Sequence, residues 1–317
     1  MNLPGCVLLD IAGIRLTSED RELLRHPVCA GLVLFSRNYS NPPQLRELIR
    51  EIKTINPHAI IAVDQEGGPV QRFRQGFTLL PAMSHWGKLY DQDRQSCYQQ
   101  LTQAVFVLAD ELKQAGVNLN LIPVLDLNHG VSQVIGSRSL HQKPEVVIDL
   151  ASIIIQGLHL QGFAAVGKHF PGHGGVDVDS HTGLPIDSRE WSMLWYQDMT
   201  PFLSLSQQLD AIMPAHIIFS AVDHRPASFS PVWLQEILRK QFNFQGVIIS
   251  DDLSMAAAAS RGDYAQRAKE CFLAGCDLLL VCNNRCGAVA ALEALSTCDL
   301  QAASLRIAKL FNLVSYP

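Results

Sequence analysis

Residues 163–181, FAAVGKHFPGHGGVDVDSH, join a short apolar run to a loop crowded with titratable side chains. The run 163–166 predicts a buried strand, which ends on the polar pair Lys168 and His169. Glycines and a proline then interrupt regular structure, and two aspartates and a histidine follow. Because loops that carry such groups on a rigid scaffold commonly hold active sites, we expect this loop to lie at the centre of the functional site.

Apolar runs of strand length recur along the chain with helical patterns between them. Eight strands are predicted, within 5–11, 31–35, 59–64, 117–127, 163–169, 210–216, 246–252 and 276–282. Short buried strands that alternate with helices indicate an α/β fold with a parallel sheet, and eight of them can close into a (β/α)8 TIM barrel. An open doubly wound sheet is the alternative, but the turn Asp10-Ile-Ala-Gly-Ile-Arg15 lacks the glycine-rich pattern that follows the first strand of nucleotide-binding folds. No boundary divides the chain, so we expect one catalytic domain, 1–317.

Composition excludes several classes of function. The chain has 317 residues, 48% of them hydrophobic, and a formal net charge of −5 without any basic run, which argues against a nucleic-acid partner. We find no signal peptide and no apolar stretch long enough to span a membrane. The eight cysteines lack the spacing of a common zinc site and fit buried, reduced thiols, which favours a cytoplasmic protein.

Polar residues follow most of the predicted strands, at the ends where the active site of a barrel lies. A pocket of hydrogen-bonding groups suits a polyhydroxylated ligand, and glycoside hydrolysis normally takes two acidic groups. The candidates for those two roles are Asp64, Glu66, Asp251, Asp252 and His181. A metal site on the His/Asp loop is the alternative, but neither an H-x-x-x-H pattern on a helix nor a Cys pair supports it.

The loop motif, Lys168-His-Phe-Pro-Gly-His-Gly followed by Asp179-Ser-His181, resembles the signature of glycoside hydrolase family 3. More narrowly, it is similar to the single-domain β-N-acetylglucosaminidases of bacterial cell-wall recycling. Further motifs match the same family in the same order and cover nearly the whole chain: Val63–Gly68, Gln71–Phe73, Ile135–Ser139, Met213–His216 and Ser250–Met255.

The resemblance implies a role for each matched residue. Asp251 would be the nucleophile that forms a covalent glycosyl-enzyme with retention, and His181 would be the acid/base, oriented by Asp179. The residues that would bind the sugar are Asp64, Arg72, Arg138, Lys168 and His169. Strand alternation lets only one of the neighbouring aspartates 251 and 252 point into the pocket, and we expect Asp252 to cap the next helix.

The resemblance therefore implies a retaining exo-β-N-acetylglucosaminidase. Its substrates would be GlcNAc-containing muropeptides or disaccharides, such as GlcNAc-1,6-anhydro-MurNAc with or without peptide. We expect a cytoplasmic monomer without metal, cofactor, nucleic-acid or membrane partner. A β-glucosidase, a β-N-acetylglucosaminide phosphorylase, an inactive sugar-binding module and a metal hydrolase stay open as alternatives. The glycines at 172, 174 and 175 predict a mobile loop.

Overall fold

Eight parallel strands form the centre of the computed structural model, which describes residues 4–180 and 183–314. The order in the sheet is β6-β3-β2-β1-β12-β11-β9-β7, and every pairing is parallel. The strands are β1 (Val7–Leu9), β2 (Cys29–Leu34), β3 (Ile60–Val63), β6 (Leu119–Asn120), β7 (Val166–Phe170), β9 (Ala211–Pro214), β11 (Val247–Asp252) and β12 (Leu278–Leu280).

The two edges of this sheet meet and close it. Val124, just after β6, forms a parallel bridge with Lys168 of β7. The backbone N–H of Leu125 donates to the Lys168 carbonyl at 2.7 Å, and the N–H of Val166 donates to the Ile122 carbonyl at 2.7 Å. The predicted (β/α)8 TIM barrel is therefore confirmed, and the open doubly wound sheet is wrong.

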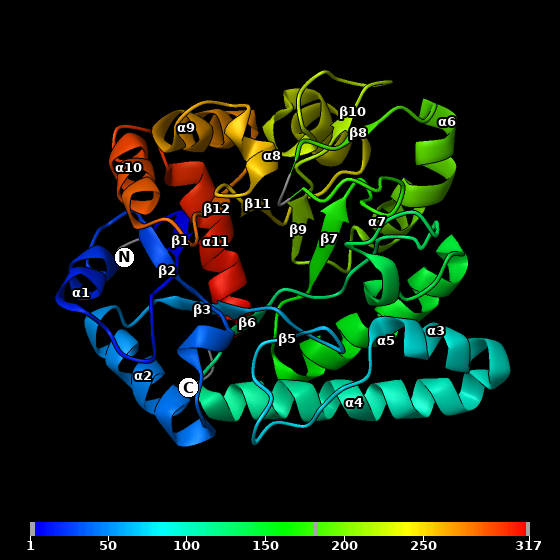
Figure 1. The fold of residues 1–317 in the computed structure, drawn as a ribbon, viewed down its shortest axis with the longest axis horizontal. Coiled ribbons are helices and arrows are strands. Elements are labelled where there is room, and N and C mark those ends of the chain that lie inside the picture. The colour runs from blue at the N-terminus through cyan, green and yellow to red at the C-terminus, as the bar shows by residue number, and fades with distance from the viewer. Residues whose placement is uncertain (1–3, 181–182, 315–317) are drawn as a thin grey trace.

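Helices surround the strands on the outside of the barrel (Figure 1). The longer ones are α1 (Ser18–Leu24), α2 (Pro42–Ile55), α3 (Met83–Gln92), α4 (Arg94–Ala115), α5 (Pro144–Gln161), α7 (Met199–Leu205), η5 (Val232–Gln241), α9 (Tyr264–Ala274), α10 (Arg285–Leu295) and α11 (Gln301–Val314). The short ones are η1 (Ser36–Asn38), η2 (Gly136–Arg138), α6 (Trp191–Met193), η3 (Leu194–Asp198), η4 (Ala227–Phe229) and α8 (Ala256–Ala259).

Helix α2 illustrates how the sequence sets these elements. The Asn41 side chain accepts a hydrogen bond from the Gln44 N–H at 3.0 Å, and Pro42 occupies the first turn, where its missing N–H costs nothing. Leu45, Leu48 and Ile52 recur at helical spacing and are buried. One apolar face therefore packs inward against the strands.

The amino-terminal ends of the strands are covered by the last helix. On α11, Ser304 Oγ donates to the carbonyl of Pro4, which precedes β1, at 2.8 Å. Arg306 Nη1 donates to Asp277, which precedes β12, at 2.8 Å. The opposite, carboxyl ends of the strands carry the polar loops, and this is the end of a barrel where active sites lie.

Two small sheets shape those loops. Strands β4 (Gln65–Gly67) and β5 (Val70–Gln71) form an antiparallel hairpin directly after β3. Strands β8 (Ile186–Asp187) and β10 (Ile218–Phe219) pair in parallel. In the part of the chain that the structure describes, no helix combines the length and apolar character needed to cross a bilayer.

Candidate active site

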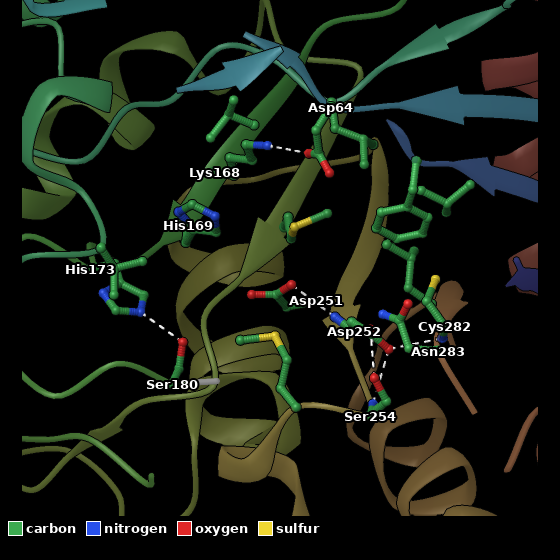
Figure 2. A pocket seen from close by; sticks show the side chains of 18 of the residues that line it. Asp64, Lys168, His169, His173, Ser180, Asp251, Asp252, Ser254, Cys282 and Asn283 are labelled. Atoms are coloured by element: carbon green, nitrogen blue, oxygen red, sulfur yellow. Dashed lines mark hydrogen bonds and ion pairs between the residues drawn. The ribbon is translucent and has the colours of Figure 1, made fainter. Parts of the chain in front are cut away.

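A pocket of about 440 Å³ lies at the carboxyl ends of the strands. Figure 2 shows side chains that project into it from β7, from β11 and from the segments that follow β3 and β12. Six of the residues predicted for the site line it: Asp64, Arg72, Arg138, Lys168, His169 and Asp251. Asp179 is half-buried and lies beside the pocket-lining Ser180. His181, the predicted acid/base, lies outside the described residues.

Lys168 is the centre of a fixed charge cluster along one wall. Its side chain is 2% exposed, and its ammonium nitrogen lies 2.7 Å from Asp64 Oδ1 and 2.8 Å from Glu66 Oε1. Arg138 binds Glu66 through two hydrogen bonds, Nε to Oε2 at 2.9 Å and Nη2 to Oε1 at 2.8 Å. Arg72 Nη2 lies 3.4 Å from Asp64 Oδ2. These bonds hold the polar ends of the pocket wall in place before any ligand arrives.

The electrostatics of this cluster keep both carboxylates charged. Burial alone would raise the pKa of Asp64, but the charges of Lys168 and Arg72 outweigh it and leave that pKa below its usual value. The same balance, set by Lys168 and Arg138, lowers the pKa of Glu66 to about 2. An acid/base needs a pKa nearer the working pH, so neither carboxylate suits that role.

Glu66, one of the candidate catalytic acids, does not face the pocket. Its side chain is 1% exposed, and both of its oxygens are occupied by Arg138 and Lys168. It is not among the residues that line the pocket. Glu66 therefore holds Arg138 and Lys168 in position, and these are two of the residues predicted to bind the sugar.

Asp126 holds His169 and His173, and nothing in its sequence context singles it out. Its fully buried carboxylate lies 2.6 Å from His169 Nδ1 and accepts the His173 backbone N–H at 2.7 Å. Burial opposes ionisation, but the neighbouring His169 ring prevails and the pKa of Asp126 is lowered. An anionic Asp126 fixes the orientation of the His169 ring, whose other nitrogen is left for the pocket.

The adjacent aspartates at the end of β11 have different surroundings. Figure 2 shows Asp251 directed toward the middle of the pocket and Asp252 directed toward Ser254. Asp252 Oδ1 accepts from the backbone N–H groups of Ser254 at 3.0 Å and Cys282 at 2.9 Å, and Oδ2 accepts from Ser254 Oγ at 2.7 Å. Helix α8 begins after Met255 without a side-chain cap, so the predicted helix cap at Asp252 is wrong. Asp252 instead joins the turn at 254 to the end of β12.

Burial raises the pKa of Asp252 to about 6, although its three hydrogen bonds act in the opposite direction. His216, completely buried after β9, holds the same backbone from the other side. Its Nε2 lies 3.2 Å from the Asp252 carbonyl, and its Nδ1 lies 2.5 Å from Ser228 Oγ. Burial lowers the pKa of His216, so its neutral ring fixes the strand end that presents Asp251.

The loop that joins β7 to β8, residues 171–185, is called the central loop here, and it is anchored at both ends of the part 171–180. His173 Nε2 lies 3.0 Å from Ser180 Oγ, and the Ser180 carbonyl accepts the Ala257 N–H of α8 at 3.0 Å. A Cβ on Gly174 would lie 1.8 Å from the Leu127 carbonyl oxygen, and one on Gly175 would lie 2.2 Å from Arg189 Nη2. Close packing therefore explains these glycines, whereas the mobility of the loop stays a prediction. Within the described ranges, no three His, Cys, Asp or Glu side chains converge as a metal site requires.

A closed (β/α)8 barrel whose carboxyl-end pocket combines carboxylates with Lys, Arg and His donors has the architecture of a glycoside hydrolase. The chain belongs to glycosyl hydrolase family 3, since residues 6–310 match the Glycosyl hydrolase family 3 N terminal domain. This match confirms the family that the motifs predicted.

Individual relatives agree with this assignment. The chain is 48% identical over 293 residues to a β-hexosaminidase of Pseudomonas aeruginosa, covering 92% of this chain and 87% of that protein. It is 49% identical to a β-hexosaminidase of Thioalkalivibrio sulfidiphilus, covering 92% and 84%. The crystal structure of native NagZ from Neisseria gonorrhoeae matches with a TM-score of 0.92 and 43% identity, covering 99% of this chain and 90% of that one. NagZ from that organism was also solved in complex with N-trifluoroacetyl-D-glucosamine, and that structure matches with a TM-score of 0.91 and 44% identity, covering 97% and 90%.

Proposed function

We propose that this protein is a retaining exo-β-N-acetylglucosaminidase that removes the non-reducing terminal GlcNAc from peptidoglycan fragments. Its class of activity, β-N-acetylhexosaminidase, follows from the family and from relatives named β-hexosaminidase. The observation that carries the finer proposal is that Asp251 shares one pocket with a prearranged set of sugar-binding side chains. The NagZ complex with a GlcNAc analogue supports a GlcNAc unit in this pocket.

The proposed reaction has two displacements at the same carbon. The Asp251 carboxylate attacks C1 of GlcNAc, the bond from C1 to the aglycone oxygen breaks, and that oxygen takes a proton from the His181 imidazolium. Water then attacks C1, gives its proton to His181, and the bond to Asp251 breaks. Two inversions give net retention. Asp179 would orient the imidazole and stabilise its cation, which lets the pair exchange a proton near neutral pH.

The charge cluster around Lys168 would bind the sugar. Asp64 would accept hydrogen bonds from sugar hydroxyls, while Lys168, Arg138 and Arg72 would donate to them, and His169 would bind through the ring nitrogen that Asp126 leaves available. Because the protein has already fixed these groups, little ordering is left for the moment of binding.

We also propose one catalytic domain, 1–317, acting as a cytoplasmic monomer on GlcNAc-containing muropeptides or disaccharides. Pairing of β1 with β12 supports the single domain, because it joins both ends of the chain in one barrel. All eight cysteines are free thiols, which supports a reducing compartment. Size-exclusion chromatography with light scattering tests the monomer.

The first test is release of p-nitrophenol from the GlcNAc β-glycoside beside the β-glucoside, with and without phosphate and EDTA. We expect GlcNAc-selective release that neither additive changes. Selectivity for glucose would favour a β-glucosidase, a sugar 1-phosphate product would favour a phosphorylase, and loss with EDTA would favour a metal hydrolase. Digestion of GlcNAc-1,6-anhydro-MurNAc peptides tests the natural substrate.

The second test is Asp251→Asn, which keeps shape and removes the nucleophilic charge. We expect kcat to fall by at least ~10³-fold, as removal of a nucleophile usually causes. In the wild type, NMR of the first product should show the β-anomer before mutarotation. An Asp251→Asn variant with wild-type kcat would end the proposed mechanism.

A further inference from the structure

A compact ionic cluster lies behind the central loop, outside the pocket. It consists of four side chains, which we call the Arg189 cluster: His129, Asp187, Arg189 and Asp198. They come from the loop after β6, from β8, from the segment after β8 and from the end of η3. Asp187 and Asp198 are buried, and Arg189 is 19% exposed. None of the four lines the pocket, so no role in the proposed reaction has yet used them.

Arg189 occupies the middle of this cluster. Its Nε lies 3.0 Å from both oxygens of Asp187, its Nη2 donates to Asp187 Oδ2 at 2.6 Å, and its Nη1 donates to Asp198 Oδ2 at 2.8 Å. His129 Nε2 lies 2.9 Å from Asp198 Oδ1. Burial works against the charge of Arg189, but the two carboxylates prevail and its pKa is raised. The guanidinium is therefore fixed in both charge and position.

The central loop rests directly on this cluster. Ideal Cβ atoms would lie 2.7 Å from Asp198 Cβ at Gly172, 3.4 Å from His129 Cδ2 at Gly174, and 2.2 Å from Arg189 Nη2 at Gly175. Real Cβ atoms almost never approach other heavy atoms within 3.0 Å, so a Cβ at 172 or 175 could be accommodated only if the cluster shifted. The incoming limb of the loop, 172–175, is therefore seated on the cluster.

The outgoing limb of the loop, 185–187, contacts the same Arg189 guanidinium through Asp187. Asp187 accepts from the backbone N–H of Arg189 at 3.0 Å, and β8 pairs with β10, where the Ile218 N–H donates to the Pro185 carbonyl at 3.1 Å. One side chain thus bonds the outgoing limb at Asp187 and packs against the incoming limb at Gly175. Arg189 therefore connects the incoming and outgoing limbs where the loop begins and ends.

We propose that Arg189 is a positioning residue for acid/base catalysis, because it joins the two limbs of the loop that carries Asp179 and His181. The inference rests on the proposed function. Proton transfer requires hydrogen-bond reach between the acid and the leaving oxygen, so a displaced loop base weakens protonation of the aglycone more than it weakens sugar binding. The Arg189 cluster, which lies outside the pocket, would in this way determine how far the acid lies from the leaving oxygen inside it.

Leaving groups of different basicity separate this role from general destabilisation. A 2,4-dinitrophenyl aglycone departs with little help from an acid, whereas a methyl or sugar aglycone needs a proton. For Arg189→Lys we expect kcat/KM on the methyl β-glycoside of GlcNAc to fall by ~10²-fold, the usual effect of a misplacement of about 1 Å. On the dinitrophenyl glycoside we expect a loss of less than about threefold, since binding and the nucleophile are unchanged.

Gly175→Ala perturbs the same contact from the other side. Gly175 does not have a left-handed backbone, so alanine adds only a methyl group against a guanidinium that its carboxylates hold in place. We expect the same dependence on the leaving group as for Arg189→Lys. Arg239→Lys is the matched control, because Arg239 is also a largely buried arginine, 2.6 Å from Asp277, at the opposite end of the barrel. It should lower stability without changing the ratio between the two substrates.

Equal losses on both substrates for Arg189→Lys and Gly175→Ala would overturn the inference, as would no loss on either. His181→Ala distinguishes this failure from failure of the proposed function. If only the inference fails, His181→Ala still loses far more activity on the methyl glycoside than on the dinitrophenyl glycoside. If His181→Ala shows no such difference, the assignment of the acid/base itself is wrong.

Discussion

Glu66→Gln tests whether the charge cluster, and not a second catalytic carboxylate, is what Glu66 provides. The substitution keeps the shape of the side chain and removes one negative charge. Lys168 would retain Asp64 at 2.7 Å, but it would lose its ionic partner at 2.8 Å, and Arg138 would lose a two-bond carboxylate. The cluster of Asp64, Glu66, Arg72, Arg138 and Lys168 would change from one excess positive charge to two.

The expected cost follows from burial. Glu66 and Lys168 are 1% and 2% exposed, and breaking a buried ion pair from one side costs roughly 3–5 kcal/mol. The pKa of Glu66 is lowered from 4.5 to about 2 in the folded protein. A depressed pKa contributes stability that is present above the unfolded value and disappears as pH falls through the folded one. The stability difference between wild type and variant should therefore be constant from pH 8 down to about 5, and it should decrease between about 4.5 and 2.

The assay is urea denaturation at pH 7, pH 5 and pH 3, together with steady-state kinetics at pH 7 on the p-nitrophenyl glycoside. We expect KM to rise more than kcat falls, because Lys168 and Arg138 lose their alignment while the proposed nucleophile and acid/base are unchanged. Glu47→Gln is the control: the Glu47–Arg50 pair is exposed, and its removal should leave both stability and kinetics unchanged. If Glu66→Gln has wild-type stability and KM, Glu66 does not hold Lys168 and Arg138 in place. If only kcat falls, Glu66 acts as a catalytic acid.

Two further substitutions test neighbouring residues. Asp252→Asn keeps the oxygen that Ser254 and Cys282 bond, so kcat/KM should stay within about tenfold of wild type. Because folding raises the pKa of Asp252 from 3.8 to about 6, the stability of the wild type relative to this variant should fall as pH rises across that range, measured by thermal denaturation. An opposite pH trend would contradict the burial argument. Asp126→Asn weakens the bonds that orient His169 and the His173 backbone, so kcat/KM should fall by ~10–100-fold, and unchanged kinetics would show that His169 needs no such support.

The fold and most of the pocket could be predicted because they depend on local patterns and one geometric rule. Apolar runs separated by helices indicate parallel strands, and the carboxyl ends of parallel strands open on the same side. That rule brings Asp64, Lys168 and Asp251 together although they are far apart in the chain. It needs no knowledge of how any side chain is oriented.

The supporting residues could not be predicted, because their roles are pairwise contacts across long separations. Asp126 lies 43 residues from His169, and Glu66 lies 72 residues from Arg138. An aspartate inside the apolar run at 119–127 has the same local pattern whether it supports a histidine or faces solvent. Asp252 shows the same limit, because alternation along the strand gives its face but not its partners at Ser254 and Cys282.

The glycines of the central loop show why flexibility is hard to infer from sequence. A glycine is required either where the backbone must bend freely or where another group leaves no room for a Cβ, and the sequence does not distinguish the two. Here Gly174 and Gly175 are pressed against Leu127 and Arg189, so the base of the loop is fixed by contact. Val176 is also buried, whereas Asp177 and Val178 are exposed. If the loop moves during turnover, its movement should therefore begin after Val176, and hydrogen exchange should be slow at 172–176 and fast at 177 and 178.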